Sequence, residues 1–284
     1  PTSKGISKDI FKFINFMGEP VPSPSPYAQY KVFQLAAKNK TKVLLDGQGA
    51  DELLAGYHYF YGFYIKGLIK KRRFSKVFDE IKNLIKGRNF KLGILSLIFL
   101  YLPKSVKKDY FISKSNISRS LLTDKSAESS FFLNYYSIDS LHKSLEFHLK
   151  YKLEHLLKWE DRNSMAHSRE ARVPFLDINF MKFILRLPED FIIKKGQTKS
   201  LMRDSMLGIV PEDIRLRSDK IGFSTPENAW INDSSLKTLL DKFFLKERPL
   251  SADYIDLLKT RKIIKSNKIG KNSRMIWKIL FLEV

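Results

Sequence analysis

A short apolar segment that runs through two glycines into an acidic helix start constrains this sequence more than any other feature. Val43–Leu45 has the composition of a buried strand. Gly47 and Gly49 follow it, and a helix then begins near Asp51. Glycines at such a turn let backbone N–H groups approach a ligand, and a helix N-terminus favours negative charge. The turn therefore predicts a site for a phosphate group or a nucleotide ribose, although it matches neither the Walker loop nor the three-glycine dinucleotide motif.

The carboxylate of Asp51 has two interpretations. As a helix cap it would contribute about 0.5–1 kcal/mol through the helix dipole. As a ligand of a hard cation it would hold magnesium, which binds one or two carboxylates together with the phosphates of a substrate. The spacing alone leaves both interpretations open.

The composition excludes several classes of site and segment. The chain has 284 residues, enough for one large domain or two small ones. It has no cysteine, which excludes disulfides, zinc–thiolate sites and a cysteine nucleophile. The longest apolar run, Leu92–Leu102, has about 11 residues, whereas a membrane-spanning helix needs about 20. No signal peptide is visible, and we expect a cytoplasmic protein.

The chain is strongly basic, with 51 lysines and arginines against 30 acids and a formal charge of +21. Such a charge suits a polyanionic partner, so a basic helical module that binds nucleic acid is one hypothesis. The basic residues are scattered, however, and no nucleic-acid-binding motif accompanies them. We interpret the charge as a solvated surface and expect salt-sensitive contacts with polyanions but no specific nucleic-acid partner.

Helix, strand, glycine turn and helix in succession are typical of a parallel α/β sheet whose ligands lie at the carboxyl ends of the strands. Only 43–45 has the pattern of a buried strand, so we expect the other strands of the sheet to lie outside this chain. Apolar periodicity predicts helices at 6–16, 25–38, 58–71, 75–86, 90–101, 117–122, 128–150, 151–168, 178–186, 198–207, 234–245, 251–265 and 272–282.

Six blocks share their order and spacing with one family: Gly18–Pro20, the pair Tyr27 and Tyr30, Lys42–Tyr57, Asp161–Asp177, Lys199–Arg203 and Lys220–Phe223. They resemble the synthetase domain of glutamine-dependent asparagine synthetases. The resemblance implies an α/β fold, namely the carboxy-terminal, predominantly helical part of an adenine nucleotide alpha-hydrolase-like (ATP-pyrophosphatase) domain with few strands. We divide the chain into a nucleotide-site α/β portion (1–62), a helical insertion (63–130) and a helical substrate-side portion (131–284).

The resemblance implies an ATP-dependent, AMP-forming ligase of asparagine biosynthesis, with ATP and magnesium as cofactors. In that family the aspartate carboxylate attacks the α-phosphate of ATP and releases pyrophosphate. Ammonia from glutamine then displaces AMP from the aspartyl adenylate. Relatives that share the domain close lactam rings or amidate sugar acids and peptides, so a related amidotransferase or ring-closing amide ligase with another carboxylate substrate is the alternative. A homodimer is left open.

The resemblance also assigns roles to individual residues. Asp51 resembles the magnesium ligand, and Asp46, Gly47 and Gly49 resemble nucleotide contacts. Lys220 resembles a catalytic cation that faces developing negative charge, with a surface lysine as the alternative.

Charged residues are unusually dense in the block 161–177. We expect them to form buried ion pairs that shape a substrate pocket, because pairing offsets the cost of burying charge. Structural reinforcement is the alternative for each. The residues are Asp161, Arg162, Glu170, Arg172 and Asp177.

Two features depart from the family. The Ser-Gly-Gly-x-Asp-Ser phosphate loop and the cysteine glutaminase domain are absent from these 284 residues. Both precede this region in relatives, so we expect a carboxy-terminal fragment that lacks its N-terminal glutaminase and phosphate-loop portion and is inactive alone. The second departure is Gln48, a catalytic position where asparagine synthetases carry an acid. Glutamine cannot accept a proton at neutral pH, so either another group is the base or the amine acceptor differs. A noncatalytic scaffold that keeps the shell of the site is a separate hypothesis.

Overall fold

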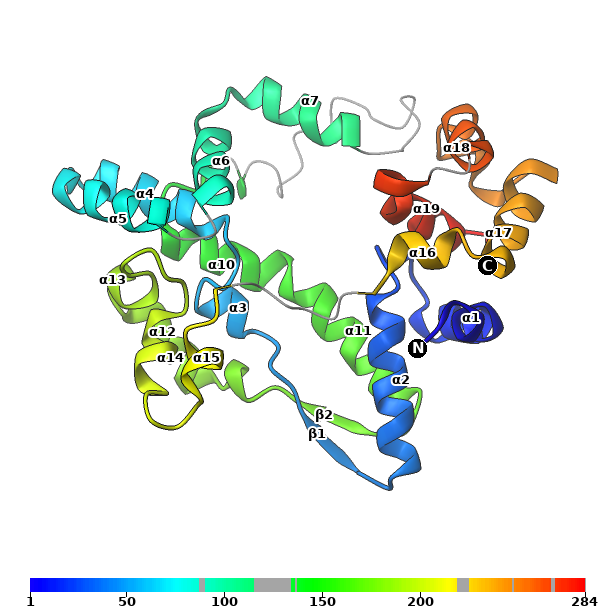
Figure 1. Cartoon of the computed structure of the whole chain (residues 1–284), viewed down its shortest axis with the longest axis horizontal. Coiled ribbons are helices and arrows are strands. Elements are labelled where there is room, and N and C mark those ends of the chain that lie inside the picture. The colour runs from blue at the N-terminus through cyan, green and yellow to red at the C-terminus, as the bar shows by residue number, and fades with distance from the viewer. Residues whose placement is uncertain are drawn as a thin grey trace.

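The computed structural model describes residues 1–86, 90–114, 134–135, 137–218, 225–246, 248–266 and 269–283. Helices dominate these residues (Figure 1). Their bounds are α1 Ser3–Met17, α2 Ser25–Lys38, α3 Ala50–Leu53, α4 Phe60–Lys70, α5 Phe74–Lys86, α6 Phe90–Tyr101, α7 Lys104–Lys114, α10 Leu141–Tyr151, α11 Leu153–Met165, α12 Ile178–Arg186, α13 Glu189–Ile192, α14 Ser200–Ser205, α15 Glu212–Arg215, α16 Glu227–Ile231, α17 Ser234–Leu240, α18 Leu257–Lys265 and α19 Ser273–Leu280.

Two short strands form a parallel pair within the described part of the chain (Figure 1). They are β1 (Val43–Leu45) and β2 (Glu170–Arg172), and Leu44 lies opposite Ala171 in the register. The predicted strand at 43–45 is confirmed, but the expectation that it is buried is wrong among the described residues, because the Leu45 side chain is 73% exposed. The second strand was not predicted, since three residues with charged ends carry no apolar pattern.

Most predicted helices are confirmed: α2, α6 and α12 have the predicted bounds, α1 is longer than predicted, and α11 lies within the predicted 151–168. The helices α7, α13, α15 and α16 were not predicted, and the predicted 251–265 is divided into a short 3-10 helix at Leu250–Asp253 and α18. The prediction at 117–122, and the beginning of the one at 128–150, lie outside the described residues. None of the helices in the described ranges is both long and apolar enough to cross a membrane.

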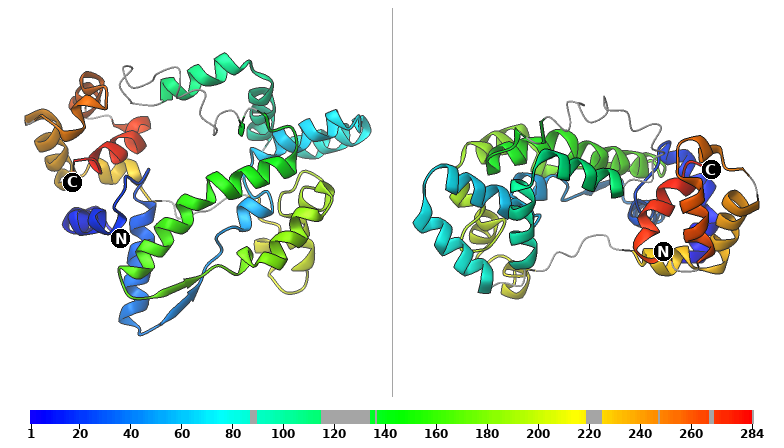
Figure 2. Two further views of the ribbon diagram at one scale, coloured as in Figure 1. Left: turned by 180° about the vertical axis from the view of Figure 1, so that it is seen from behind. Right: turned by 90° about the horizontal axis from the view of Figure 1, so that it is seen from above.

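Two hydrophobic cores lie toward opposite ends of the consecutive helices α10 and α11, which run from one group of helices to the other (Figures 1 and 2). One packs α1 and α2 against α16, α17 and α19 around Phe13 and Trp277. The other packs α3 and α4 against α10, α12 and α13 around Phe60 and Leu145. Both cores draw on the predicted portions 1–62 and 131–284, and the division of the chain into three portions stays a prediction.

The helix α11 is fixed against the N-terminal segment of the chain. The Glu19 carboxylate accepts a hydrogen bond from Trp159 Nε1 at 3.1 Å and pairs with Lys158. Further along α11, Asn163 Nδ2 donates to the Pro26 carbonyl oxygen at 2.9 Å and to the Gln29 amide oxygen at 3.0 Å. Buried polar groups that are satisfied in this way hold a helix in one position. One face of α11 is thereby presented to the turn that follows β1.

Candidate functional site

The turn between β1 and α3 is built by backbone hydrogen bonds. The Asp46 N–H donates to the Arg172 carbonyl oxygen at 2.8 Å, which extends the strand pair by one bond. The Gly47 N–H donates to the Asp46 carboxylate at 2.6 Å. An added Cβ at Gly47 would meet no heavy atom within 4 Å, so this stretch of backbone is open to a ligand. The predicted strand, glycine turn and helix are confirmed, and the nucleotide contacts of Asp46, Gly47 and Gly49 stay a prediction.

Gly49 is required by the shape of this turn. Its φ of +87° lies in the left-handed region that side chains disfavour. An added Cβ would also clash with the Cδ2 and Cγ atoms of Leu176. The close approach of the turn to Leu176 therefore fixes where α3 begins.

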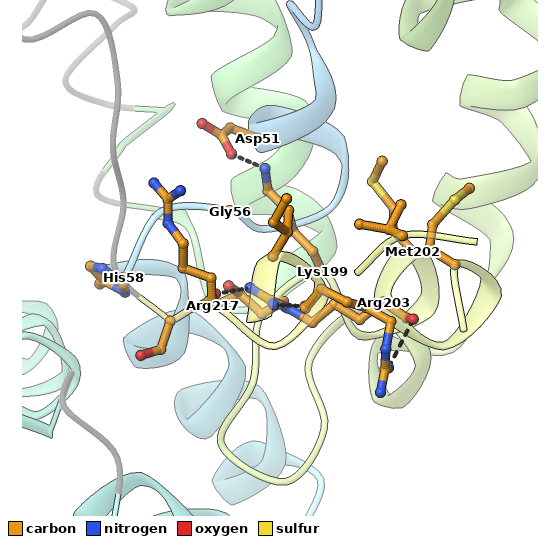
Figure 3. Close-up of a pocket in the computed structure, with 13 residues that line it drawn as sticks. Asp51, Gly56, His58, Lys199, Met202, Arg203 and Arg217 are labelled. Atoms are coloured by element: carbon orange, nitrogen blue, oxygen red, sulfur yellow. Dashed lines mark hydrogen bonds and ion pairs between the residues drawn. The ribbon is translucent and has the colours of Figure 1, made fainter. Parts of the chain in front are cut away.

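An ion pair joins α3 to the segment before α14. Oδ1 of Asp51 lies 2.5 Å from Nζ of Lys199, and the two side chains point toward each other in Figure 3. The Lys199 N–H donates to the Leu54 carbonyl oxygen at 3.0 Å. Gly56 leaves room for the pair, because a Cβ there would overlap the Asp51 carboxylate and the Lys199 chain. The Lys199–Arg203 block, which received no individual role from the sequence, is thus placed beside Asp51.

A pocket of about 470 Å³ opens around this ion pair (Figure 3). Its lining includes Lys199, Arg203, Arg215 and Arg217, with Asp51 as the acid. The Arg203 guanidinium donates to the Thr198 and Arg217 carbonyl oxygens at 2.9 and 2.8 Å, which folds the segment 198–217 around the pocket. An excess of cationic side chains makes such a pocket attractive to an anion.

No group of three or more histidine, aspartate or glutamate side chains that could hold a metal ion occurs among the described residues. A magnesium ion held by one or two carboxylates and the phosphates of a substrate does not require such a group. The Lys199 ammonium also occupies one oxygen of Asp51, where it would compete with a cation. The magnesium role of Asp51 stays a prediction.

A buried carboxyl group faces the same turn from α11. Glu160 is 2% exposed. Its carboxyl lies beside the side chains of Asp46 and Gln48. Burial, followed by the negative charge of Asp46, raises the pKa of Glu160 to about 8. The sequence analysis missed this residue, because a single glutamate between Trp159 and Asp161 carries no signal of its own.

The charged block 161–177 does not form the buried ion pairs that we expected. Glu170 and Arg172 do pair at 2.7 Å, but their side chains are 55% and 60% exposed, so water screens the pair. Asp177 caps α12 by accepting from the Asn179 and Phe180 N–H groups at 3.0 and 2.9 Å.

The other two residues of that block, and Lys220, have different positions. Asp161 is exposed, and the Arg162 guanidinium packs where a Cβ at Gly18 would lie. None of the five charged residues of the block is among the lining residues of the pocket in Figure 3. Their substrate contacts stay predictions. Lys220 lies outside the described residues, two positions after the pocket residue Ser218.

Comparisons with known proteins find similarity to one family along nearly the whole chain. The asparagine synthase family model matches residues 2–284. The glutamine-hydrolyzing asparagine synthetase 1 of Bacillus subtilis (strain 168) is 26% identical over 313 residues, covering 99% of this chain and 46% of the relative. A putative asparagine synthetase of Mycobacterium tuberculosis (strain H37Rv) is 24% identical, with 98% and 45% covered. The chain spans about half the length of these curated relatives. It belongs to the asparagine synthase family.

Proposed function

We propose that this chain forms the synthetase part of an ATP-dependent, AMP-forming ligase that amidates aspartate in asparagine biosynthesis, with ammonia derived from glutamine. Family membership over residues 2–284 supports the reaction class. The observation that carries the proposal is the Asp51–Lys199 pair, which joins the open glycine turn to the cationic pocket. A nucleotide and its phosphates need this combination of close backbone and positive charge.

The proposed chemistry has two steps. A carboxylate oxygen of aspartate attacks the α-phosphorus of ATP, the bond to the β-phosphate oxygen breaks, and pyrophosphate leaves. The nitrogen of ammonia then attacks the acyl carbon, AMP leaves, and the nitrogen gives up one proton. Both steps depend on positioning and on neutralising phosphate charge.

In the proposal, the residues of the turn and those of the pocket bind different parts of ATP. Asp46, Gly47 and Gly49 contact the nucleotide, and Lys199 and Arg217 draw the phosphates toward the pocket. The roles of Lys220 and of magnesium, the cytoplasmic location and the ammonia supply from a glutaminase portion are carried over from the family and belong to the proposal.

A related amidotransferase or ring-closing amide ligase with another carboxylate substrate is the second candidate. The observation that favours it is Gln48, a neutral side chain at the turn beside Glu160. A ligase whose amine acceptor is a carboxylate other than aspartate is expected to have an altered amine site.

A carboxylate panel tests the choice of substrate. The intact protein is incubated with ATP, magnesium and ammonium together with aspartate, glutamate or no carboxylate, and AMP and pyrophosphate are quantified. We expect equimolar AMP and pyrophosphate that depend on aspartate. Product formation with another carboxylate but not with aspartate would support the second candidate, and formation of ADP and phosphate would contradict adenylation altogether.

A further inference from the structure

We propose that Glu160 accepts the proton that ammonia loses when it attacks the acyl adenylate. This inference rests on the proposed function and assigns to α11 the base that Gln48 cannot be. In this step the nitrogen lone pair forms the bond to the acyl carbon, the bond from that carbon to the AMP oxygen breaks, and an N–H proton moves to a Glu160 carboxylate oxygen. The amide leaves neutral, and the protonated Glu160 returns its proton to solvent.

The position of Glu160 supports the assignment. Its side chain is buried on α11, and its carboxyl group lies against the side chains of Asp46 and Gln48. Both of these residues stand on the turn proposed to hold the nucleotide. An amine that attacks an acyl group held at this turn would meet the Glu160 carboxyl group as a proton acceptor.

The charges around Glu160 suit a proton acceptor for an amine. Asp46 is the charged neighbour on the turn, and Gln48 beside it is neutral. Burial of Glu160 and the neighbouring charge of the half-buried Asp46 both disfavour its ionised form, so Glu160 holds a proton at a pH where an ordinary glutamate has lost it. Among the charged groups on the other elements packed against α11, Asp9 pairs with Lys31, Lys143 with Asp139, and Glu170 with Arg172. A pKa of about 8 makes Glu160 a stronger base than an ordinary carboxylate.

The first test separates the two chemical steps in the intact protein. Glu160→Gln keeps the size of the side chain but removes its basicity. We expect carboxylate-dependent ATP–pyrophosphate exchange, which reports adenylation, to stay within about twofold, and amide formation from ammonia to fall about 10²- to 10⁴-fold. At a fixed concentration of unprotonated ammonia, amide formation in the parent protein is expected to rise as the pH passes about 8, and the variant loses this rise. Glu154→Gln, an exposed glutamate on the same helix, is the matched control.

A second variant guards against a merely structural effect. The double variant Glu160→Gln, Gln48→Glu removes the carboxyl group from α11 and places one at position 48 of the turn instead. We expect it to recover amide formation at least about tenfold over Glu160→Gln. Loss of exchange together with amide formation in Glu160→Gln, or amide formation at the parent rate, would overturn the proposal.

An infrared titration makes the test independent of activity. A protonated carboxyl band is expected at pH 7 in the parent, fading as the pH passes about 8 and absent in Glu160→Gln. Absence of the band in the parent would overturn the proposal. If the band is present but no carboxylate supports exchange, the proposed ligase function fails and the proton acceptor role fails with it, whereas loss of amide formation alone supports both.

Discussion

Replacing Asp51 with alanine is expected to lower kcat/KM for ATP about 100-fold in the intact protein, and Lys199→Ala is expected to do the same. The reason is the 2.5 Å ion pair between the two side chains, which fixes the Lys199 ammonium at the mouth of the pocket beside the glycine turn. Without its partner the lysine loses its position, and positioning provides much of the rate of phosphoryl and adenylyl transfer.

A double-mutant cycle checks whether the two residues act together. If they act as one unit, Asp51→Ala with Lys199→Ala costs little more than either change alone. The exposed pair Arg248 and Asp253, 2.9 Å apart and distant in sequence from the site, is the matched control, and its removal is expected to leave kcat/KM unchanged. Additive losses would show that Asp51 serves another partner, such as a metal ion. Unchanged activity in Asp51→Ala would remove its proposed role and favour a noncatalytic scaffold.

Gly49→Ala is expected to destabilise the fold by about 3 kcal/mol, because the backbone strain and the clash with Leu176 add together. In a chain of this size that corresponds to a fall in Tm of roughly 6–12 °C. Thermal unfolding measured by circular dichroism would show the change. We also expect the KM for ATP to rise, since α3 and Asp51 follow the turn directly.

Two other glycines separate the causes. Gly208 has a φ of +77° and open space around it, so Gly208→Ala isolates the cost of strain, about 1 kcal/mol. Gly47→Ala meets no atom within 4 Å and is expected to change stability by less than about 0.5 kcal/mol. Leu176→Ala in the Gly49→Ala background removes the clash and recovers part of the loss. Equal Tm values for Gly47→Ala and Gly49→Ala would contradict the packing of the turn.

Local pattern was sufficient to predict the turn. The apolar run at 43–45, the two glycines and the acidic helix start all act over a few residues, and their physical preferences agree. The second strand, Glu170–Arg172, could not be predicted in this way, because it is held in place by pairing with a strand more than a hundred residues earlier. Its exposed charged ends instead suggested buried ion pairs, which the structure does not show.

The residues of the candidate site differ in the same way, because local pattern was sufficient to predict some of them and not others. Asp51 was recognisable from its place at the helix start, whereas its partner Lys199 is brought beside it by the fold of the segment 198–217. Glu160 was still harder to predict, because only the docking of α11 against α2 and the turn gives its carboxyl group a buried position next to Asp46. The positions of Lys199 and Glu160 are therefore set by long-range packing, which a single sequence does not display.

Isotope transfer provides the test of the proposed acyl adenylate. Aspartate labelled with ¹⁸O in its side-chain carboxylate is given to the intact protein with unlabelled ATP and ammonia, and the AMP and pyrophosphate are analysed by mass spectrometry. If the carboxylate attacks the α-phosphate, AMP gains one ¹⁸O atom per turnover and pyrophosphate gains none. Amide formation with unlabelled AMP, or with the label in inorganic phosphate, would contradict the proposed reaction.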